Sequence, residues 1–287
     1  MTCPRPSRLL LLTGLAGLLA GCGPQESPFR NVDGTWHYHK TPITKADAKS
    51  FEVLADHYAK DRARVYHADT YRDGKEYYTV RHDRVIEIAG ADPASFRYIA
   101  REYARDAANV YFEGVRMAVA DSASFELLDD GFARDRTSGY CHQAVVAGSD
   151  GATFAAIDAR YAKDARRVFH CAIETDGGAR RPYVSVVALP GARPASFRAL
   201  DSGYAADATQ VYYRDRVLGR DAASFVVLPS DYAKTAVAVY YRGDVVRSAD
   251  PASFATLEVP TDLADASDAA ATYRLGTRTP KAAAPGS

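Results

Sequence analysis

The chain contains 287 residues, with 36 basic and 36 acidic side chains and a formal net charge of +0. Removal of residues 1–21 takes away Arg5 and Arg8 and leaves a net charge of about −2, without the basic stripe that marks a nucleic-acid-binding protein. Hydrophobic residues make up 47% of the sequence, which is an ordinary share for a globular chain.

Residues 1–22 combine a positive start, a short apolar run and a terminal cysteine. Arg5 and Arg8 form a positive start, and the apolar run over residues 9–20 is shorter than the roughly 20 residues that a membrane-spanning helix needs. The stretch closes on Leu-Ala-Gly-Cys, which resembles the lipobox of bacterial lipoproteins, where the cysteine is acylated and becomes the first residue after cleavage. By this resemblance, Cys22 is the lipid-attachment residue.

This pattern predicts a signal peptide over residues 1–21 and a turn-rich tether over residues 22–33. The mature chain is then held at a membrane by the lipid anchor at Cys22, because several acyl chains together give a firm anchor. The next residue is Gly23 rather than Asp, which by resemblance to the Gram-negative sorting scheme favours the outer membrane, facing the periplasm. The alternative is an ordinary secretory signal that is cleaved near Ala20.

One pattern recurs six times along the rest of the chain. It consists of Asp-x-x-Ser/Thr-Phe, an aromatic residue seven positions after the phenylalanine and a second aromatic fifteen positions after it. Arg193 replaces the acid in the fifth copy, and Thr235 replaces a further acid, ten positions after the phenylalanine, in the sixth. A fixed period of roughly 20–50 residues indicates stacked supersecondary units. The marker phenylalanines are Phe51, Phe96, Phe125, Phe154, Phe197 and Phe225, with a degenerate seventh at Phe254.

The marker spacings of 45, 29, 29, 43, 28 and 29 residues indicate that a block of three units was duplicated. The long spacing follows the first unit of each block, and the two inserted stretches are alike. We therefore expect a repeat domain over residues 34–260, with its blocks over residues 47–149 and 150–249. A degenerate cap and a disordered tail are expected over residues 261–287.

The sequence of a single unit predicts a small antiparallel meander. In the second unit Asp-Pro at 92–93 suits one helical turn, and residues 96–99 alternate as a short strand does. Residues 110–112 and 115–118 suit a further strand and its return, joined by Glu-Gly at 113–114, which is a two-residue hairpin signal. Each unit is therefore expected to hold two or three short antiparallel strands. The expected fold is all-β, with tandem β-hairpin or meander repeats of about 29 residues in an open array. A closed, propeller-like ring is the alternative, because the half-unit at residues 34–43 can pair with the degenerate last copy.

Three stretches of the chain resemble the DKNYY family of bacterial repeat proteins, which is named for Asp-Lys-Asn-x-Val-Tyr-Tyr. They are Tyr-Ala-Lys-Asp to Val-Tyr at residues 58–66, Tyr-Ala-Lys-Asp to Val-Phe at 161–169, and Tyr to Val-Tyr-Tyr at 204–213. The resemblance extends over residues 34–258, although other residues replace the Lys-Asn pair of the motif. It implies a repeat fold on an exported or lipidated chain, and it implies no reaction, because the function of the family is unknown.

Two cysteines, Cys141 and Cys171, belong to the body of the mature chain. An exported compartment favours a disulfide between them, with two free thiols, or a metal site with His142 or His170, as the alternatives. The cysteines stand sixteen and seventeen positions after their marker phenylalanines. Because successive strand residues face opposite sides of a sheet, we expect a bulge or a one-residue slip to bring the two cysteines together.

Three sets of side chains are possible ligand-binding sites, but the sequence favours another interpretation of each set. The repeated acids suit Ca²⁺, yet each unit offers only two, fourteen residues apart, so turn and cap roles are expected instead. His37 and His39 suit a metal if they share one strand face, but no third ligand is evident. The repeated tyrosines suit an exposed ladder for glycans, yet their recurrence in every unit favours stacking between neighbours.

The sequence contains no recognisable catalytic motif, phosphate loop or metal-binding motif, so no catalytic residue, cofactor or metal ligand is predicted. The expected function is a non-catalytic binding or scaffolding module of the cell envelope, with the membrane and envelope proteins or glycans as partners. The alternative is an envelope hydrolase with its site in the two insertions, over residues 67–91 and 170–192. The candidate residues of that alternative are His67, His170, His82 and Glu87.

Overall fold

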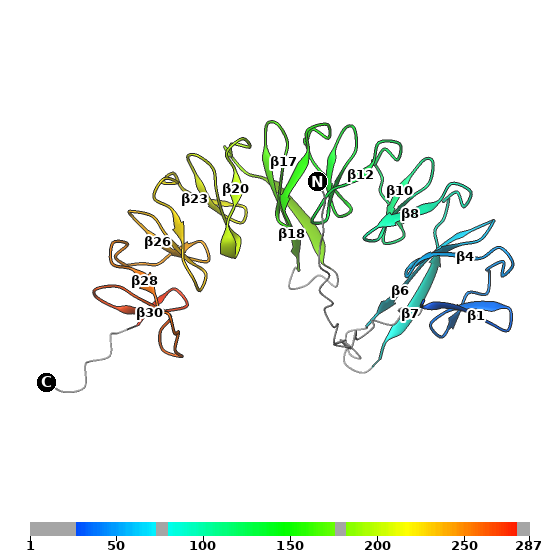
Figure 1. Cartoon of the computed structure of the whole chain (residues 1–287), viewed down its shortest axis with the longest axis horizontal. Helices are drawn as coiled ribbons and strands as arrows, with labels where there is room; N and C mark the ends of the chain where they lie inside the picture. Colours follow the sequence, from blue (N-terminus) through cyan, green and yellow to red (C-terminus); the bar gives the residue numbers. More distant parts are fainter. Residues whose placement is uncertain (1–26, 73–79, 176–181, 280–287) are drawn as a thin grey trace, which may run out of the picture.

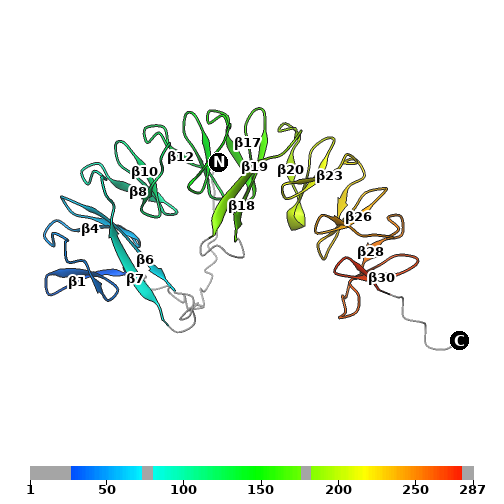
Figure 2. The same cartoon turned by 180° about the vertical axis from the view of Figure 1, so that it is seen from behind.

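The computed structural model describes residues 27–72, 80–175 and 182–279. Within these residues the chain forms eight small antiparallel sheets that follow one another in an open arch (Figure 1). The first and last sheets lie at opposite ends of the arch (Figures 1 and 2), and no strand pairing among the described residues joins them. The predicted all-β open array is thus confirmed, and the closed ring is excluded. The described part contains no helix with the length and apolar character needed to cross a membrane.

Every sheet is a meander, in which strands consecutive in sequence pair side by side. The first sheet, the half-unit, contains β1 (Phe29–Val32), β2 (Thr35–Tyr38) and β3 (Thr41–Pro42). We call the seven four-stranded sheets that follow units 1 to 7. Units 1 to 3 contain β4 (Glu52–Ala55), β5 (Tyr58–Lys60), β6 (Val65–Tyr71) and β7 (His82–Glu87); β8 (Arg97–Ala100), β9 (Tyr103–Arg105), β10 (Val110–Phe112) and β11 (Val115–Arg116); and β12 (Glu126–Leu127), β13 (Phe132–Arg134), β14 (Gly139–Cys141) and β15 (Ala144–Val146).

Units 4 and 5 contain β16 (Ala155–Asp158), β17 (Tyr161–Lys163), β18 (Val168–Glu174) and β19 (Tyr183–Ala188); and β20 (Arg198–Ala199), β21 (Tyr204–Ala206), β22 (Val211–Tyr213) and β23 (Arg216–Gly219). Units 6 and 7 contain β24 (Val226–Val227), β25 (Tyr232–Lys234), β26 (Val239–Tyr241) and β27 (Asp244–Val245); and β28 (Ala255–Thr256), β29 (Ala266–Ser267), β30 (Thr272–Arg274) and β31 (Thr277–Thr279). A short 3₁₀ turn, η2 (Asp201–Gly203), precedes β21.

Each unit contains four strands, where the sequence predicted two or three. In unit 2, β9 and β10 form the central hairpin. The first strand, β8, follows Phe96 and pairs with β9, and the last strand, β11, pairs with β10. The sequence predicted both outer strands and missed β9, which is only three residues long and shows too little alternation to be recognised. The predicted helical turn is a single hydrogen-bonded turn, in which the Phe96 N–H donates to Asp92 O at 2.9 Å.

The repeated acids have the turn and cap roles that the sequence predicted. In unit 3, Oδ1 of Asp135 accepts the backbone N–H groups of Thr137 at 2.7 Å and Ser138 at 2.8 Å. Oδ2 accepts the Asp121 N–H at 2.9 Å and the Tyr140 hydroxyl at 2.6 Å. Burial alone would raise the pKa of this carboxyl, but these donors outweigh burial and lower the pKa to about 2. The same contact between acid and tyrosine recurs as Asp61 with Tyr66, Asp106 with Tyr111, Asp207 with Tyr212 and Asp268 with Tyr273.

The hydrophobic core of the described residues is divided into seven layers, each between two neighbouring sheets. The layer between units 2 and 3 contains Tyr103, Val110, Met117, Phe125, Ala133 and Tyr140. Residues seven positions after a marker face the next unit, and those eight and fifteen positions after it face the preceding unit, because successive strand residues alternate. The pattern tyrosines are therefore buried between units, as expected, and do not form an exposed ladder for glycans.

A disulfide joins Cys141 of β14 to Cys171 of β18, as predicted, with their Cα atoms 6.5 Å apart. The expected bulge or slip is not needed between them. Cys141 pairs with Phe132 on the face that contacts unit 4, whereas Cys171 follows His170 by one position and faces unit 3. A disulfide between two stacked sheets joins a residue on the forward face of one sheet to a residue on the rear face of the next sheet. Two cysteines on opposite strand faces therefore meet between the sheets without a bulge or a slip. The bond therefore connects the two three-unit blocks at their boundary.

The repeat domain extends further at both ends than the sequence predicted. At the front, β1 begins at Phe29, so residues 29–32 belong to the fold and not to the tether. At the back, β29, β30 and β31 continue the last sheet past the predicted boundary at residue 260, as far as Thr279. Unit 7 is hard to recognise because its second aromatic, Tyr273, stands nineteen positions after Phe254 instead of fifteen.

The two insertions form the long hairpins β6–β7 and β18–β19, which project from the concave side of the arch (Figures 1 and 2). Their tips, residues 73–79 and 176–181, lie outside the described residues. The same holds for the predicted signal peptide over residues 1–21, for the lipid-attachment residue Cys22 and for the chain after Thr279.

Candidate functional site

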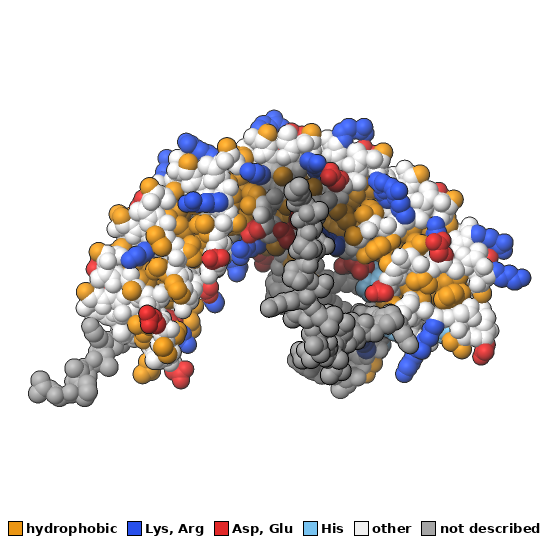
Figure 3. All heavy atoms as spheres, in the orientation of Figure 1, with side chains coloured by type: hydrophobic (Ala, Val, Ile, Leu, Met, Phe, Trp, Pro, Cys, Tyr) orange, Lys and Arg blue, Asp and Glu red, His pale blue; other side chains and the backbone are white. Residues whose placement is uncertain are grey.

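The concave side of the arch is formed by turns that all lie at the same end of the strands. In each unit, the turn between the first and second strands lies at the end of the strands opposite the turn of the central hairpin, because the strands are antiparallel. In the space-filling view, acidic, basic and histidine side chains lie along this side (Figure 3). We call this surface the inner rim. The turns between the first and second strands of units 1 to 6 contribute residues 56–57, 101–102, 128–131, 159–160, 200–203 and 228–231. The turns between the third and fourth strands of units 2, 3, 5 and 6 contribute residues 113–114, 142–143, 214–215 and 242–243.

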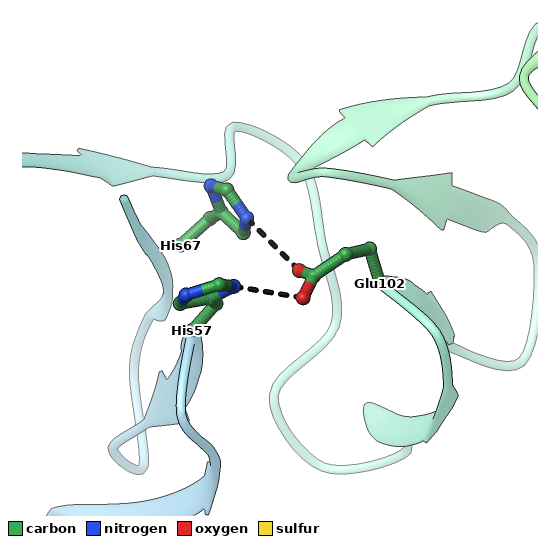
Figure 4. A group of neighbouring side chains, drawn as sticks. All are labelled: His57, His67 and Glu102. Atoms are coloured by element: carbon green, nitrogen blue, oxygen red, sulfur yellow. Dashed lines mark hydrogen bonds and ion pairs between the residues drawn. The ribbon is translucent and has the colours of Figure 1, made fainter. Parts of the chain in front are cut away.

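A cluster of possible metal ligands lies on the inner rim, at the boundary between units 1 and 2 (Figure 4). It contains His57 from the turn between β4 and β5, His67 from β6, and Glu102 from the turn between β8 and β9. One ligand atom from each residue lies within 4.8 Å of the other two. Nδ1 of His57 lies 2.7 Å from Oε1 of Glu102, whereas Nε2 of His67 lies 3.7 Å from Oε2, beyond hydrogen-bonding distance.

Residues of the repeat framework hold this cluster in place. The Tyr58 hydroxyl donates to Glu102 O at 2.9 Å and accepts the Gly114 N–H at 2.8 Å, so a pattern tyrosine fixes the turn that carries Glu102. The His67 ring packs against the Tyr58 ring, with the ring centroids 4.9 Å apart. A Cβ atom at position 114 would come within 2.6 Å of His67, so this turn approaches the imidazole closely only because residue 114 is glycine.

The backbone at Glu102 has a conformation that residues other than glycine seldom adopt. Its φ is +67° and that of Arg101 is +49°, as a two-residue hairpin turn with two left-handed central residues requires. The equivalent position holds Gly131 in unit 3 and Gly203 in unit 5. A glutamate is thus present here at a backbone cost of roughly 1 kcal/mol, as is Asp231 at the same position of unit 6, where φ is +64°.

The cluster contains two buried polar atoms without a hydrogen-bond partner in the described structure, Nε2 of His67 and Oε2 of Glu102. Burial alone would raise the pKa of the Glu102 carboxyl, but contacts with the two imidazoles outweigh burial and lower the pKa below its usual value. Glu102 is therefore a carboxylate at neutral pH. A buried polar atom without a partner costs about 1–3 kcal/mol, so a group that contacts both atoms would stabilise the cluster.

The second block has a different set of residues at the equivalent place. The positions of His57, His67 and Glu102 are taken there by Arg160, His170 and Gly203. Because arginine and glycine side chains supply no metal ligand, the second block lacks the cluster. A hollow of about 850 Å³ lies here instead, and its lining includes Arg160, Arg214 and Arg242. Burial lowers the pKa of the His170 imidazole in this hollow.

The model of the DKNYY family matches three overlapping stretches of the chain, residues 29–172, 70–216 and 132–274. The chain belongs to the DKNYY family. No curated protein and no solved structure matches it. Since DKNYY is a repeat family of unknown function, membership explains the repeated sheets and assigns no ligand. The matched stretches include the cluster of His57, His67 and Glu102, which therefore lies within the DKNYY repeats.

The hydrolase alternative places its site in the two insertions of this DKNYY chain, and within the described residues the candidates of the first insertion have separate contacts. His67 belongs to the cluster described above. His82 pairs with Tyr71 toward the far end of the β6–β7 hairpin, where the two rings stack with centroids 5.3 Å apart. Glu87 lies 3.5 Å from the guanidinium Nε of Arg64. Among the described residues of this hairpin, these contacts do not assemble the nucleophile, base and orienting group that hydrolysis needs.

His37 and His39 of the half-unit do not form the metal pair that the sequence allowed. β2 ends at Tyr38, and His39 lies in the following turn with φ +49°, so the two histidines do not share a strand face. The Nδ1 atom of His37 instead contacts Thr35 O at 3.0 Å.

Of the three residues of this cluster in the DKNYY repeats, only His67 was predicted from the sequence as a candidate, and His57 and Glu102 were not. Both stand six positions after a marker phenylalanine, and His67 stands sixteen positions after one. The register of the central hairpin pairs Tyr58 with His67, which brings positions six and sixteen to the same end of the unit. This register could have placed His57 beside His67, but it does not reveal that Glu102 of the next unit lies against the two histidines.

Proposed function

We propose that the protein is a lipid-anchored, non-catalytic binding or scaffolding module of the bacterial cell envelope. The lipobox-like sequence that ends at Cys22 supports the anchor, and the residue that follows favours the outer membrane, facing the periplasm. The disulfide between Cys141 and Cys171 agrees with an oxidising compartment. The open arch supports binding, because stacked repeats present an extended concave surface to a partner.

The observation that carries this proposal is the contrast between a constant framework and a variable inner rim. The acids ten positions after a marker and most of the repeated aromatic residues are buried in turns and core layers, where they have structural roles. The residue six positions after each of the first six markers lies on the inner rim and varies among the units. In units 1 to 6 it is His57, Glu102, Gly131, Arg160, Gly203 and Asp231. Repeat proteins bind their partners by displaying changing side chains on such a constant scaffold.

The partner that best fits the inner rim is an envelope protein whose surface carries charges of both signs. In unit 6, Arg242 lies 2.8 Å from Asp231, and in unit 4 Arg160 lies 3.4 Å from Asp158. Cations and anions that lie side by side at the rim within one unit favour a surface of mixed charge over a uniformly anionic polymer.

Replacement of Cys22 by alanine is expected to move the full-length protein from the membrane fraction to the soluble fraction of the envelope. The alanine side chain has no thiol to acylate, and the acyl chains supply the membrane affinity. Membrane fractionation followed by immunoblotting measures the effect. Cys141→Ala is the matched control, because it removes a cysteine and leaves the lipobox-like sequence unchanged. Membrane association of Cys22→Ala equal to that of the wild type would contradict the anchor.

A further inference from the structure

We propose that His57, His67 and Glu102 bind one divalent transition-metal ion of the zinc class. Two imidazole nitrogens and one carboxylate oxygen form a ligand set that proteins use for such ions, whereas Ca²⁺ and Mg²⁺ prefer oxygen ligands. The metal site depends neither on the anchor nor on the partner proposed above.

The first observation is the convergence of three side chains from separate segments. The imidazoles of His57 and His67 and the carboxylate of Glu102 point toward one another (Figure 4), with one ligand atom of each within 4.8 Å of the others. Around a tetrahedral zinc ion with bonds of about 2.1 Å, ligand atoms lie roughly 3.4 Å apart. The distance of 3.7 Å between Nε2 of His67 and Oε2 of Glu102 is already close to this value. Small side-chain shifts therefore suffice to admit an ion.

The second observation is the pair of buried atoms that lack hydrogen bonds. His67 is only 3% exposed, and its Nε2 atom faces Oε2 of Glu102, which is also without a hydrogen bond in the described structure. Buried polar atoms in proteins are nearly always satisfied, so a cluster that merely joined two units would be expected to pair these atoms. A cation satisfies both, because it accepts one electron pair from the imidazole nitrogen and one from the carboxylate oxygen.

The cluster is also open on one side, toward the inner rim. The side chains of His57 and Glu102 are 39% and 32% exposed, whereas His67 forms the closed floor of the site. An ion can therefore enter from solvent. Three protein ligands leave one position of a tetrahedral ion free, and this position faces the rim, where water or a side chain of a bound partner can occupy it.

The second block supplies an internal control for the proposed site. His170 occupies the strand position equivalent to that of His67 and is similarly buried, at 5% exposure, but its neighbours are Arg160 and Gly203. Loss of His170 should therefore affect packing much as loss of His67 does, without removing a metal ligand.

The test is zinc binding by the full chain in detergent, purified without a histidine tag. Titration calorimetry with ZnCl₂ and metal analysis after dialysis are expected to give one zinc ion per wild-type chain. Binding should weaken by at least about tenfold in His67→Ala and Glu102→Gln, and it should be unchanged in His170→Ala. Cobalt(II) provides a second readout, since visible absorption bands of a tetrahedral site are expected from the wild type and not from Glu102→Gln.

Glu102→Gly keeps the test decisive if the other variants fold poorly. Glycine is the natural residue at this position in units 3 and 5, and it fits the left-handed backbone. This variant is expected to retain the wild-type circular dichroism spectrum and to lose stoichiometric zinc binding. A wild-type chain that takes up no zinc, or zinc binding that persists at wild-type strength in Glu102→Gly and His67→Ala, would overturn the proposal.

Discussion

The Asp135→Ala variant is expected to lose roughly 3–5 kcal/mol of its free energy of unfolding, because it removes the acceptor from buried donors. Asp135 is 2% exposed, and its carboxylate accepts the N–H groups of Asp121, Thr137 and Ser138 as well as the hydroxyls of Thr137 and Tyr140. Each donor left unpaired in the interior costs about 1–3 kcal/mol, and water that enters the gap recovers part of the sum. Urea denaturation followed by far-UV circular dichroism measures the loss.

The sixth unit provides the matched control for this prediction, because Thr235 stands there in place of the acid. Its hydroxyl oxygen accepts two of the turn N–H groups, from Val237 at 3.2 Å and Ala238 at 3.1 Å. Asp135→Thr should therefore lose clearly less stability than Asp135→Ala. Equal losses in the two variants, or a loss below about 1 kcal/mol in Asp135→Ala, would show that the carboxylate does not hold the turn together.

The Cys141→Ala/Cys171→Ala double variant is expected to lose about 3–4 kcal/mol, as the chain-entropy model gives for a disulfide of this loop length. The sequence separation of the two cysteines is 30 residues. Because each unit contacts only its neighbours, the loss should be confined to the boundary between units 3 and 4, and urea unfolding should separate into two transitions.

This boundary depends on the disulfide because it lacks the tyrosine hydroxyls found at its neighbours. The Tyr103 hydroxyl donates to His142 O of the next unit at 2.9 Å, and the Tyr161 hydroxyl donates to Arg214 O at 2.9 Å. Phe132 stands at the corresponding position of unit 3 and has no hydroxyl to donate. The covalent bond thus takes the place of a hydrogen bond that crosses from one unit to the next.

Hydrogen exchange locates the effect of the double variant, with faster exchange expected in the core hairpins of units 3 and 4 than in those of unit 1. Reductant added to the wild type should reproduce the double variant, and reductant added to the double variant should change nothing. A double variant that unfolds in one transition at the wild-type midpoint would contradict a weak boundary here.

The sheets of this protein could be predicted from sequence because their framework residues recur at fixed offsets. An acid such as Asp106 and an aromatic such as Tyr111 keep the same separation in successive units, so one backbone conformation is reused. The bounds of the repeat domain were predicted too narrowly at both ends, because this spacing fails there. β1 has no marker phenylalanine in a recognisable pattern before it, and unit 7 has four additional residues between Phe254 and Tyr273.

The cluster of His57, His67 and Glu102 could not be predicted because it depends on how two units stack. His57 and Glu102 are 45 residues apart and belong to different sheets, and no local spacing brings them together. The expectation that Cys141 and Cys171 need a bulge or a one-residue slip to meet was wrong for the same reason. A single sheet suggests that opposite faces separate two residues, whereas stacked sheets place opposite faces in contact.

The most direct test of a partner-binding inner rim is site-specific photocrosslinking of the full-length chain in cells. A crosslinking residue at the position of Arg214 probes the inner rim, and one at the position of Arg136 probes the opposite end of the strands, where the arginine side chain is 73% exposed. We expect a discrete adduct with an envelope protein from the Arg214 position and none from the Arg136 position. Adducts of equal yield from both positions, adducts from the Arg136 position alone, or no adduct from the rim would contradict binding at the inner rim.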